Sequence, residues 1–339
     1  MIKLLILILP LNLLGVDIPA FEEQFNGIIN TYRHRLPMIQ NYQGADPARR
    51  IMNYLMAFSN QTGNLPSKIA LRDKIRGQMH TGEPLNFLLP AFPFKSKNPA
   101  KVLGDDPDLG DLIALETLSH MARQIKDVYG PGARINLIAD GVLCAEALGV
   151  SENEVTAYVL KIRQLISLNN MPLTIQQLDN LDHVKTYGKK FDQLTKILDA
   201  VPVAESDHLA SFVSREMQGA YYVVKYGDGL NEQVENAKTL ISTRSLKFSA
   251  LLQEITAGQE FIRLSIHKNN RDISVKKHIQ LIINQPRGGT PWHNAPFVDA
   301  NLNITLGEVV PGITFAYQPY GIDFPIRWIV RGNENHPQP

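Results

Sequence analysis

The stretch Glu83–Gly104 reads EPLNFLLPAFPFKSKNPAKVLG and decides the fold. Its first part, Leu85–Leu89, is a short apolar run bounded by Pro84 and Pro90, and this length suits a buried strand rather than a buried helix. Because proline donates no backbone hydrogen bond, Pro90 and Pro93 predict that the strand stops there as an interior member of a sheet. The sequence therefore predicts a buried strand that runs into a loop.

The loop after this strand is polar and basic. It contains Lys95, Ser96, Lys97 and Lys101, which bring three cations and a hydroxyl group together. In an open α/β sheet, ligands bind beyond the carboxyl ends of the strands. A loop of this composition at that place is suited to hold an anion such as phosphate, but charge alone favours a solvated basic loop, since such patterns give many false positives.

The segments around this strand alternate between helical and extended patterns. Asp108 caps an apolar-faced helix, the strand Ala133–Ala139 follows, and the capping box Ser151–Glu154 opens another helix. Strand, helix, strand, helix is the order typical of a parallel sheet with crossover helices. We predict an α/β fold: a Rossmann-like, largely parallel sheet flanked by helices, with further helical and β-rich C-terminal parts. The remaining strands are expected over Glu260–Lys268, His278–Ile283 and within Leu302–Arg331.

Apolar spacing predicts helices on the amino-terminal side as well. Two are expected within Phe21–Phe58, separated by Ala45-Asp46-Pro47, and Ser67 begins a third that runs to about Thr81. On this third helix Arg72 and Arg76 share a face, which is either solvated or directed at an anion. The expected divisions are an apolar arm over 1–20, an α/β region over 21–331 with a helical subregion over 169–250, and a polar tail over 332–339.

Composition excludes several classes of protein. The chain has 339 residues, of which 44% are hydrophobic and 20% charged, as in a globular protein with a sizeable core. The net charge of +1 argues against nucleic acid as the main partner. The single cysteine, Cys144, excludes an intrachain disulfide and a cysteine-cluster metal site.

The amino-terminal stretch Met1–Val16 is apolar apart from Lys3 and Asn12, and Pro10 interrupts it. It resembles a signal peptide in its basic residue and short apolar core, but it lacks a good cleavage site. It is also short for a membrane-spanning helix, which needs about 20 apolar residues. We predict a cytoplasmic protein with an apolar arm, and a signal peptide is the alternative.

Polar residues at the ends of the predicted strands form the candidate site. They are rich in cations and include one carboxylate, which suits a phosphorylated substrate and a carboxylate-bearing one, with His or Asp moving protons. A metal site would use two of the histidines and the aspartate, but their spacing is not that of typical ligands. A Ser/His/Asp hydrolase is disfavoured because no G-x-S-x-G turn is present. The candidates are Lys95, Ser96, Lys101, Asp140, Arg263, Ser265, His267 and His293.

Five strings in order carry a family resemblance. They read GEPLNFLLPAFPFKS, PDLGDLIALETL, YGPGARINLIADG, IRLSIHK and GGTPWHN, within a region of about Phe21 to Arg331. Together they resemble the pyoverdine/dityrosine biosynthesis family, the isocyanide (isonitrile) synthases.

The resemblance implies an enzyme that joins the amino nitrogen of an aromatic L-amino acid, tyrosine or tryptophan, to ribulose 5-phosphate with loss of phosphate. This lyase-type, carbon–carbon bond-cleaving reaction would need no metal and no other cofactor. By matching motif, Lys95, Ser96 and Lys101 would hold phosphate. Arg263 and Ser265 would contact substrate, with the arginine on a carboxylate or the phosphate. The resemblance also implies a downstream iron- and 2-oxoglutarate-dependent oxygenase that acts on the product.

The same resemblance implies that Asp140, His267 and His293 are acid/base groups or contacts of the sugar hydroxyls. Two departures from the family pattern affect the site: Lys97-Asn98 stands where Pro-Asn is usual, and 142–146 lacks the usual aromatic residue and Asp. The alternatives are an N-formyl amino acid-forming relative, a non-catalytic sugar-phosphate-binding protein, and a metal-dependent hydrolase or lyase that uses the histidines.

Overall fold

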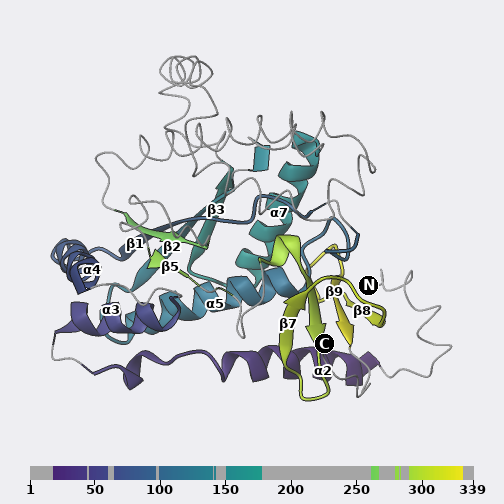
Figure 1. Ribbon diagram of the computed structural model, residues 1–339, viewed down its shortest axis with the longest axis horizontal. Helices are drawn as coiled ribbons and strands as arrows, with labels where there is room; N and C mark the ends of the chain where they lie inside the picture. The colour runs from purple at the N-terminus through teal and green to yellow at the C-terminus, as the bar shows by residue number, and fades with distance from the viewer. Residues whose placement is uncertain are drawn as a thin grey trace, which may run out of the picture.

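The structure is a computed structural model in which two β-sheets share a core with the surrounding helices (Figure 1). In Figure 1 a parallel sheet lies above the helices α3 (Pro47–Ala57) and α5 (Leu109–Lys126), and the yellow-green C-terminal sheet lies to its right. The residues that the structure describes are 18–43, 46–59, 65–96, 99–139, 141–142, 150–177, 261–266, 279–281, 283 and 290–330.

The first sheet is parallel and confirms the predicted fold class. It has five strands in the order β3-β2-β1-β4-β5, and every pair of neighbours is parallel. The chain builds it outward from β1 through β2 to β3, then crosses to the other side of β1 to add β4. The strands are β1 (Leu85–Pro90), β2 (Ala133–Ala139), β3 (Leu173–Gln177), β4 (Ile262–Ser265) and β5 (Ile279–Gln280).

The two faces of this sheet differ in polarity because side chains alternate along each strand. One face carries Phe87, Ile135, Leu173 and Ile262 in register, and all four are buried. Helix α7 lies on this face, where the side-chain amide of Gln177 donates to the hydroxyl oxygen of Thr156 on α7. The opposite face carries a more polar row in register, which consists of Leu88, Asn136, Thr174 and Arg263.

Three helices, α3, α5 and α7, begin where local capping chemistry predicts, whereas α4 begins at Leu65 and not at the predicted Ser67. In α3 Pro47 occupies the first turn and the Asp46 carboxylate accepts from the backbone N–H of Ala48. Capping boxes open both α5 and α7, at Asp108 and Ser151. The helices are α2 (Ile18–Arg33), α3 (Pro47–Ala57), α4 (Leu65–Met79), α5 (Leu109–Lys126) and α7 (Glu152–Leu168), with short 3₁₀ turns η1 (Ile39–Asn41) and η5 (Pro291–His293).

The second sheet has four strands in the order β7-β6-β9-β8. Helix α5 contacts both β6 and β9 as well as β2, so this helix joins the two sheets. The strands are β6 (Ala295–Val298), β7 (Ile304–Gly307), β8 (Ile313–Tyr317) and β9 (Ile326–Val330). The β-rich C-terminal part predicted from the sequence is therefore present.

Two local predictions need correction. The helical reading of 169–250 is wrong at β3, whose alternating Leu173, Ile175 and Gln177 are buried against α7 and β2; residues 178–250 lie outside the described part. The first helix expected before Ala45 is shorter than its apolar spacing indicates, because α2 ends at Arg33 and Ile39 begins a separate 3₁₀ turn. Residues 1–17 and 331–339 also lie outside the described part. No helix among the described residues has the length and hydrophobicity needed to cross a membrane.

Candidate functional site

The strand order places a topological switch point between β1 and β4. On one side of this pair the chain continues to β2, and on the other side it continues to β5. When the loops after two neighbouring parallel strands run in opposite directions, a crevice forms at the carboxyl ends of those strands. Open α/β sheets bind their ligands in this crevice. The segment after Pro90 and the end of β4 therefore border the position at which a ligand is expected.

Arg263 lies on β4 at this switch point. Its Nε is buried and has no hydrogen-bond partner among the described residues. Burial lowers the pKa of Arg263 to about 10, so the guanidinium remains a cation at neutral pH. A half-buried guanidinium that no described carboxylate pairs with is costly unless something else neutralises it. The arrangement is that of a binding group for an anion.

The other polar groups in the row beside Arg263 satisfy one another. The side-chain amide of Asn136 donates to Asn86 Oδ1 at 2.6 Å and to the carbonyl of Phe87 at 3.1 Å. Thr174 Oγ1 donates to Asn136 Oδ1 at 2.9 Å. These bonds run across β1, β2 and β3, so the polar row is internally paired, whereas no described residue bonds to Arg263 Nε at its end.

Lys95 is not in the environment that the sequence suggested. Its side chain is 1% exposed, and its ammonium lies 2.8 Å from Asp108 Oδ2 and 2.6 Å from Asp111 Oδ2. It also donates to the backbone carbonyl of Pro291 at 2.8 Å. The loop is thus neither solvated nor openly cationic at this residue, because a buried acidic pair neutralises the ammonium. The phosphate-binding role of Lys95 stays a prediction.

Electrostatics within this buried cluster follow from its mixed charges. Burial alone lowers the pKa of Lys95, but the two carboxylates outweigh it and the pKa is raised, so the ammonium form persists. Burial raises the pKa of Asp108 to about 7 against the opposing effect of Lys95. Burial, together with the Asp111 carboxylate, raises the pKa of Tyr158 well above its usual value, and its hydroxyl donates to Asp111 Oδ1 at 2.8 Å.

The η5 turn carries His293 and rests on the loop after β1. The backbone N–H of Ser96 donates to the carbonyl of Trp292 at 2.8 Å. The Trp292 ring packs against the Phe92 ring with centroids 5.2 Å apart. Phe92 has a φ of 57°, which is unusual for a bulky residue. The proline that follows it disfavours the right-handed α region at Phe92. This strained turn directs the aromatic ring of Phe92 at Trp292.

The other predicted contacts fall in several places. Ser96 is buried beside the η5 turn, and Ser265 is half-buried at the end of β4. Lys101 lies at the C-terminal sheet, where its ammonium is 3.2 Å from Glu308 Oε1. The structure therefore places Lys95 and Ser96 against the η5 turn, and Lys95 and Lys101 have different acidic partners.

Asp140 and His267 lie outside the described residues, so their predicted roles stay predictions. The residue after Asp140 does locate that end of β2. A Cβ on Gly141 would meet the carbonyl oxygen of Pro93 at 2.2 Å and Phe94 Cδ1 at 2.9 Å. The carboxyl end of β2 therefore lies directly against the loop that follows β1.

Metal ligands are a separate question. The described ranges contain no group of three or more His, Cys, Asp or Glu side chains arranged to hold a metal ion. Two of the three candidate ligands, Asp140 and His267, are outside those ranges, so this finding leaves metal binding by them untested.

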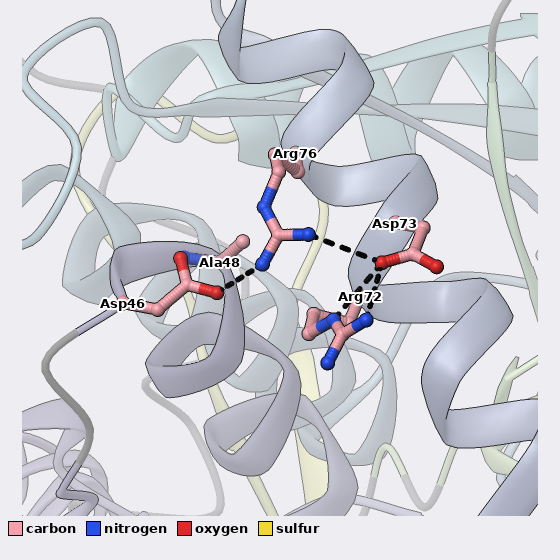
Figure 2. Close-up of polar contacts among 5 residues, drawn as sticks. All are labelled: Asp46, Ala48, Arg72, Asp73 and Arg76. Carbon is pink, nitrogen blue, oxygen red and sulfur yellow. Dashed lines mark hydrogen bonds and ion pairs between the residues drawn. The ribbon is translucent and has the colours of Figure 1, made fainter.

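The arginine pair on α4 belongs to a surface ion-pair network (Figure 2). Arg72 donates to Asp73 Oδ1 at 2.7 Å, and Arg76 lies between Asp73 and Asp46 (Figure 2). Asp46 in turn caps α3 through the backbone N–H of Ala48. The pair therefore joins α4 to the start of α3, which agrees with the solvated alternative.

Two site residues were missed by sequence reasoning. Asp108 was recognised only as a helix cap, and the burial of Asp111 and its contact with Lys95 were not foreseen. The available signal was two aspartates three residues apart at the start of an otherwise apolar helix. Such residues usually face solvent at a helix N-terminus, so pattern alone favours the capping role.

Fold and site together define an α/β protein with a Rossmann-like parallel sheet and a candidate anion site at its switch point. The chain belongs to the pyoverdine/dityrosine biosynthesis protein family, whose profile matches residues 75–218 and 207–310. This confirms the membership that the five sequence strings predicted.

Individual relatives agree with this assignment. An L-tryptophan isonitrile synthase from Fischerella ambigua is 33% identical over 268 residues, covering 73% of this chain and 82% of that protein. An L-tyrosine isonitrile synthase from Pseudomonas aeruginosa is 30% identical over 283 residues, covering 77% and 80%. The crystal structure of the PvcA protein from Pseudomonas aeruginosa matches with a TM-score of 0.68 at 22% identity, over 85% of this chain and 100% of that chain, and shows the shared fold.

Proposed function

We propose that this protein is an isocyanide synthase. It joins the amino group of an aromatic L-amino acid, tyrosine or tryptophan, to the ketone carbon of ribulose 5-phosphate. Both carbon–carbon bonds of that carbon then break, so that it becomes the isocyanide carbon while phosphate and the four other sugar carbons leave. Support comes from the family and from relatives that are named as L-tryptophan and L-tyrosine isonitrile synthases. The observation that carries the proposal is Arg263, a half-buried cation at the switch point whose buried Nε has no hydrogen-bond partner among the described residues, because each substrate carries an anionic group, a carboxylate or a phosphate, that such a cation binds.

The first chemical step in this proposal is imine formation. The neutral amine attacks the ketone carbon, a C–N bond forms, and a base removes the proton from nitrogen before water leaves. His293, together with Asp140 and His267, is proposed to accept and return these protons. An imidazole suits the task because its usual pKa is near neutral pH.

Phosphate loss requires stabilisation of the negative charge on the leaving group, which fixed cations and hydrogen-bond donors supply. We assign Arg263 to the substrate carboxylate or to the phosphate, since a guanidinium binds either group through two parallel hydrogen bonds. Ser96, Ser265 and Lys101 are proposed contacts of the sugar phosphate. These assignments involve no metal and no redox cofactor.

The direct test is incubation of purified protein with ribulose 5-phosphate and either L-tyrosine or L-tryptophan, followed by mass spectrometry and phosphate release. The expected product has the mass of the amino acid isocyanide, and an N-formyl product would instead be heavier by one water. Absence of any product with both amino acids, while ribulose 5-phosphate is still bound, would support the non-catalytic alternative.

A matched pair of variants tests the role of Arg263. Arg263→Met should raise the Michaelis constant for one substrate by roughly 10- to 150-fold, which corresponds to about 1.5–3 kcal/mol for a charge-assisted bond. The substrate whose constant rises identifies the anion that Arg263 holds. Arg134→Met is the control, because Arg134 is exposed on the same sheet face but towards the amino end of β2. Equal effects of the two changes would remove Arg263 from the site.

A further inference from the structure

The buried cluster around Lys95 has no task in the reaction proposed above. It joins the loop after β1, the start of α5, the side of α7 and the η5 turn through one ammonium and two carboxylates. We propose that Lys95 is a positioning residue that holds the η5 turn and thereby orients His293, and that it is not a ligand of the substrate phosphate. The proposal rests on the proposed function only in taking His293 as a proton-transfer group.

The first argument is the number of donors. A lysine ammonium has three N–H groups. Three oxygens of this chain surround it: the carbonyl of Pro291 accepts a hydrogen bond at 2.8 Å, and Asp111 Oδ2 at 2.6 Å and Asp108 Oδ2 at 2.8 Å are ion-pair partners, although Asp108 Oδ2 lacks hydrogen-bond geometry. With the side chain only 1% exposed, a phosphate would have to displace one of these acceptors to be bound.

The second argument is the sign of the charge. With both carboxylates ionised, one ammonium and two carboxylates give the cluster a net charge of −1. Protonation of Asp108 would make it neutral, and in neither state is it positive. An approaching phosphate would therefore gain little from Lys95, and moving it into this buried site would cost desolvation of its own charge. Arg263, which lacks a carboxylate partner among the described residues, is the better place for an anion.

The third argument is the bonding of the η5 turn. Two consecutive residues of the loop bind two consecutive carbonyls: the Lys95 ammonium holds Pro291, and the Ser96 backbone N–H holds Trp292. The Phe92 ring adds an aromatic contact to Trp292 from the strained turn. The next residue along the chain is His293, whose position thus depends on both carbonyl bonds.

Hydrogen bonds within the η5 turn also fix the position of His293 relative to Pro291 and Trp292. The backbone N–H of His293 donates to the carbonyl of Thr290 at 3.1 Å, and the Asn294 side-chain amide donates to the same carbonyl at 2.9 Å. A Cβ on Gly110 would come within 3.3 Å of Pro291 Cβ, so the turn also rests closely on the start of α5. Loss of the Lys95 bond would free one side of a turn that is fixed on the others.

The test separates positioning from phosphate binding by kinetics. In Lys95→Met, we expect kcat to fall at least tenfold while the Michaelis constant for ribulose 5-phosphate changes less than threefold. Because this change leaves two buried carboxylates without their cation, a second variant, Lys95→Met with Asp108→Asn, keeps the cluster at its original net charge and retains a good helix cap. Lys126→Met, an exposed lysine of α5, is the control.

Nuclear magnetic resonance provides a readout that needs no turnover. The ring signals of His293, assigned by comparison with His293→Gln, should shift in both Lys95 variants and stay unchanged in Lys126→Met. In the unaltered protein, the Nζ signal of Lys95 should not move when ribulose 5-phosphate is added. These spectra decide the inference even if the unaltered protein makes no isocyanide, an outcome that would instead refute the proposed function.

The opposite pattern would overturn the proposal. A Michaelis constant for ribulose 5-phosphate that rises more than tenfold at unchanged kcat, with His293 signals in their original positions, would make Lys95 a phosphate ligand. A sugar phosphate-dependent shift of the Lys95 Nζ signal in the unaltered protein would lead to the same conclusion, whether or not the variants fold.

Discussion

Replacing Tyr158 by phenylalanine tests whether the buried cluster is as tightly bonded as its geometry indicates. The change removes one hydroxyl group and keeps the ring, which lies on the buried face of α7 in the hydrophobic core. In the structure this hydroxyl donates to Asp111 Oδ1 at 2.8 Å, and Tyr158 and Asp111 are 2% and 0% exposed. The variant therefore isolates a single hydrogen bond between two helices.

The expected loss follows from the charge of the acceptor. A hydrogen bond to a charged group contributes roughly 1.5–3 kcal/mol, and the carboxylate left behind is too buried to recover a bond from water. We therefore expect Tyr158→Phe to lower the free energy of unfolding by about 2 kcal/mol. No cavity contribution adds to this, because the ring stays in place.

The pH dependence gives a second signature. Burial raises the pKa of Tyr158 well above the usual 10.0, so the hydroxyl keeps its proton and the loss should be constant between about pH 7 and pH 9. Above about pH 10 the tyrosine of the unfolded chain ionises while the folded one remains protonated. The native protein should therefore lose stability as pH rises through that range, and Tyr158→Phe should lack this component of the loss.

Urea unfolding followed by circular dichroism measures both effects, with the slope on denaturant checked for constancy. Tyr320→Phe is the control, since Tyr320 is fully exposed and should change the free energy of unfolding by less than about 0.5 kcal/mol. If Tyr158→Phe unfolds within 0.5 kcal/mol of the unaltered protein, the reasoning about the buried carboxylate is refuted.

Three further predictions concern packing, pairing and cofactors. Gly141→Ala should destabilise the fold by about 3 kcal/mol or prevent folding, because the new Cβ would lie 2.2 Å from the Pro93 oxygen; Gly77→Ala, with nothing within 4 Å, should stabilise α4 by up to about 1 kcal/mol. Arg33→Ala should cost about 1–3 kcal/mol in urea unfolding, because it leaves the buried carboxylate of Glu116 without its bidentate partner. Dialysis against a chelator should leave isocyanide synthesis at full rate, since imine formation and phosphate loss both run on protons and fixed charges.

Each of these has a contrary outcome. Similar unfolding midpoints for the two glycine variants would mean that the contact at Gly141 relaxes without cost. An unchanged midpoint in Arg33→Ala would mean that solvent reaches Glu116. Loss of turnover on chelation, with recovery on added zinc or iron, would make the histidines metal ligands and refute the proton-transfer mechanism.

The local structure followed from the sequence because its causes are local. Asp108 and Ser151 cap their helices through bonds to residues two or three positions away, and β2 spans the predicted residues. The alternating sequence of β4 likewise placed Arg263 on the sheet face opposite to Ile262 and Leu264, without knowledge of the neighbouring strands. Periodicity failed at β3, whose five residues lie inside a region with helical spacing on the whole.

The family also followed from the sequence, because its short motifs can be read directly from the order of the residues. The same strings pointed to the candidate residues, although they left the duty of each one undecided. The anion-binding role of Arg263 stays a prediction, and the burial of its Nε without a hydrogen-bond partner among the described residues was not readable from the pattern IRLSIHK.

Only the tertiary structure decided what surrounds Lys95 and where the switch point lies. The bond from Lys95 to Pro291 spans 196 positions, and the pairing of β1 with β4 joins Phe87 to Ile262, 175 positions apart. No periodicity encodes such contacts, because they arise when helices and strands pack around a common core and bring distant polar groups together. A lysine in a polar sequence context is usually solvated, and here the packing of α5 against the loop after β1 buries it beside two carboxylates.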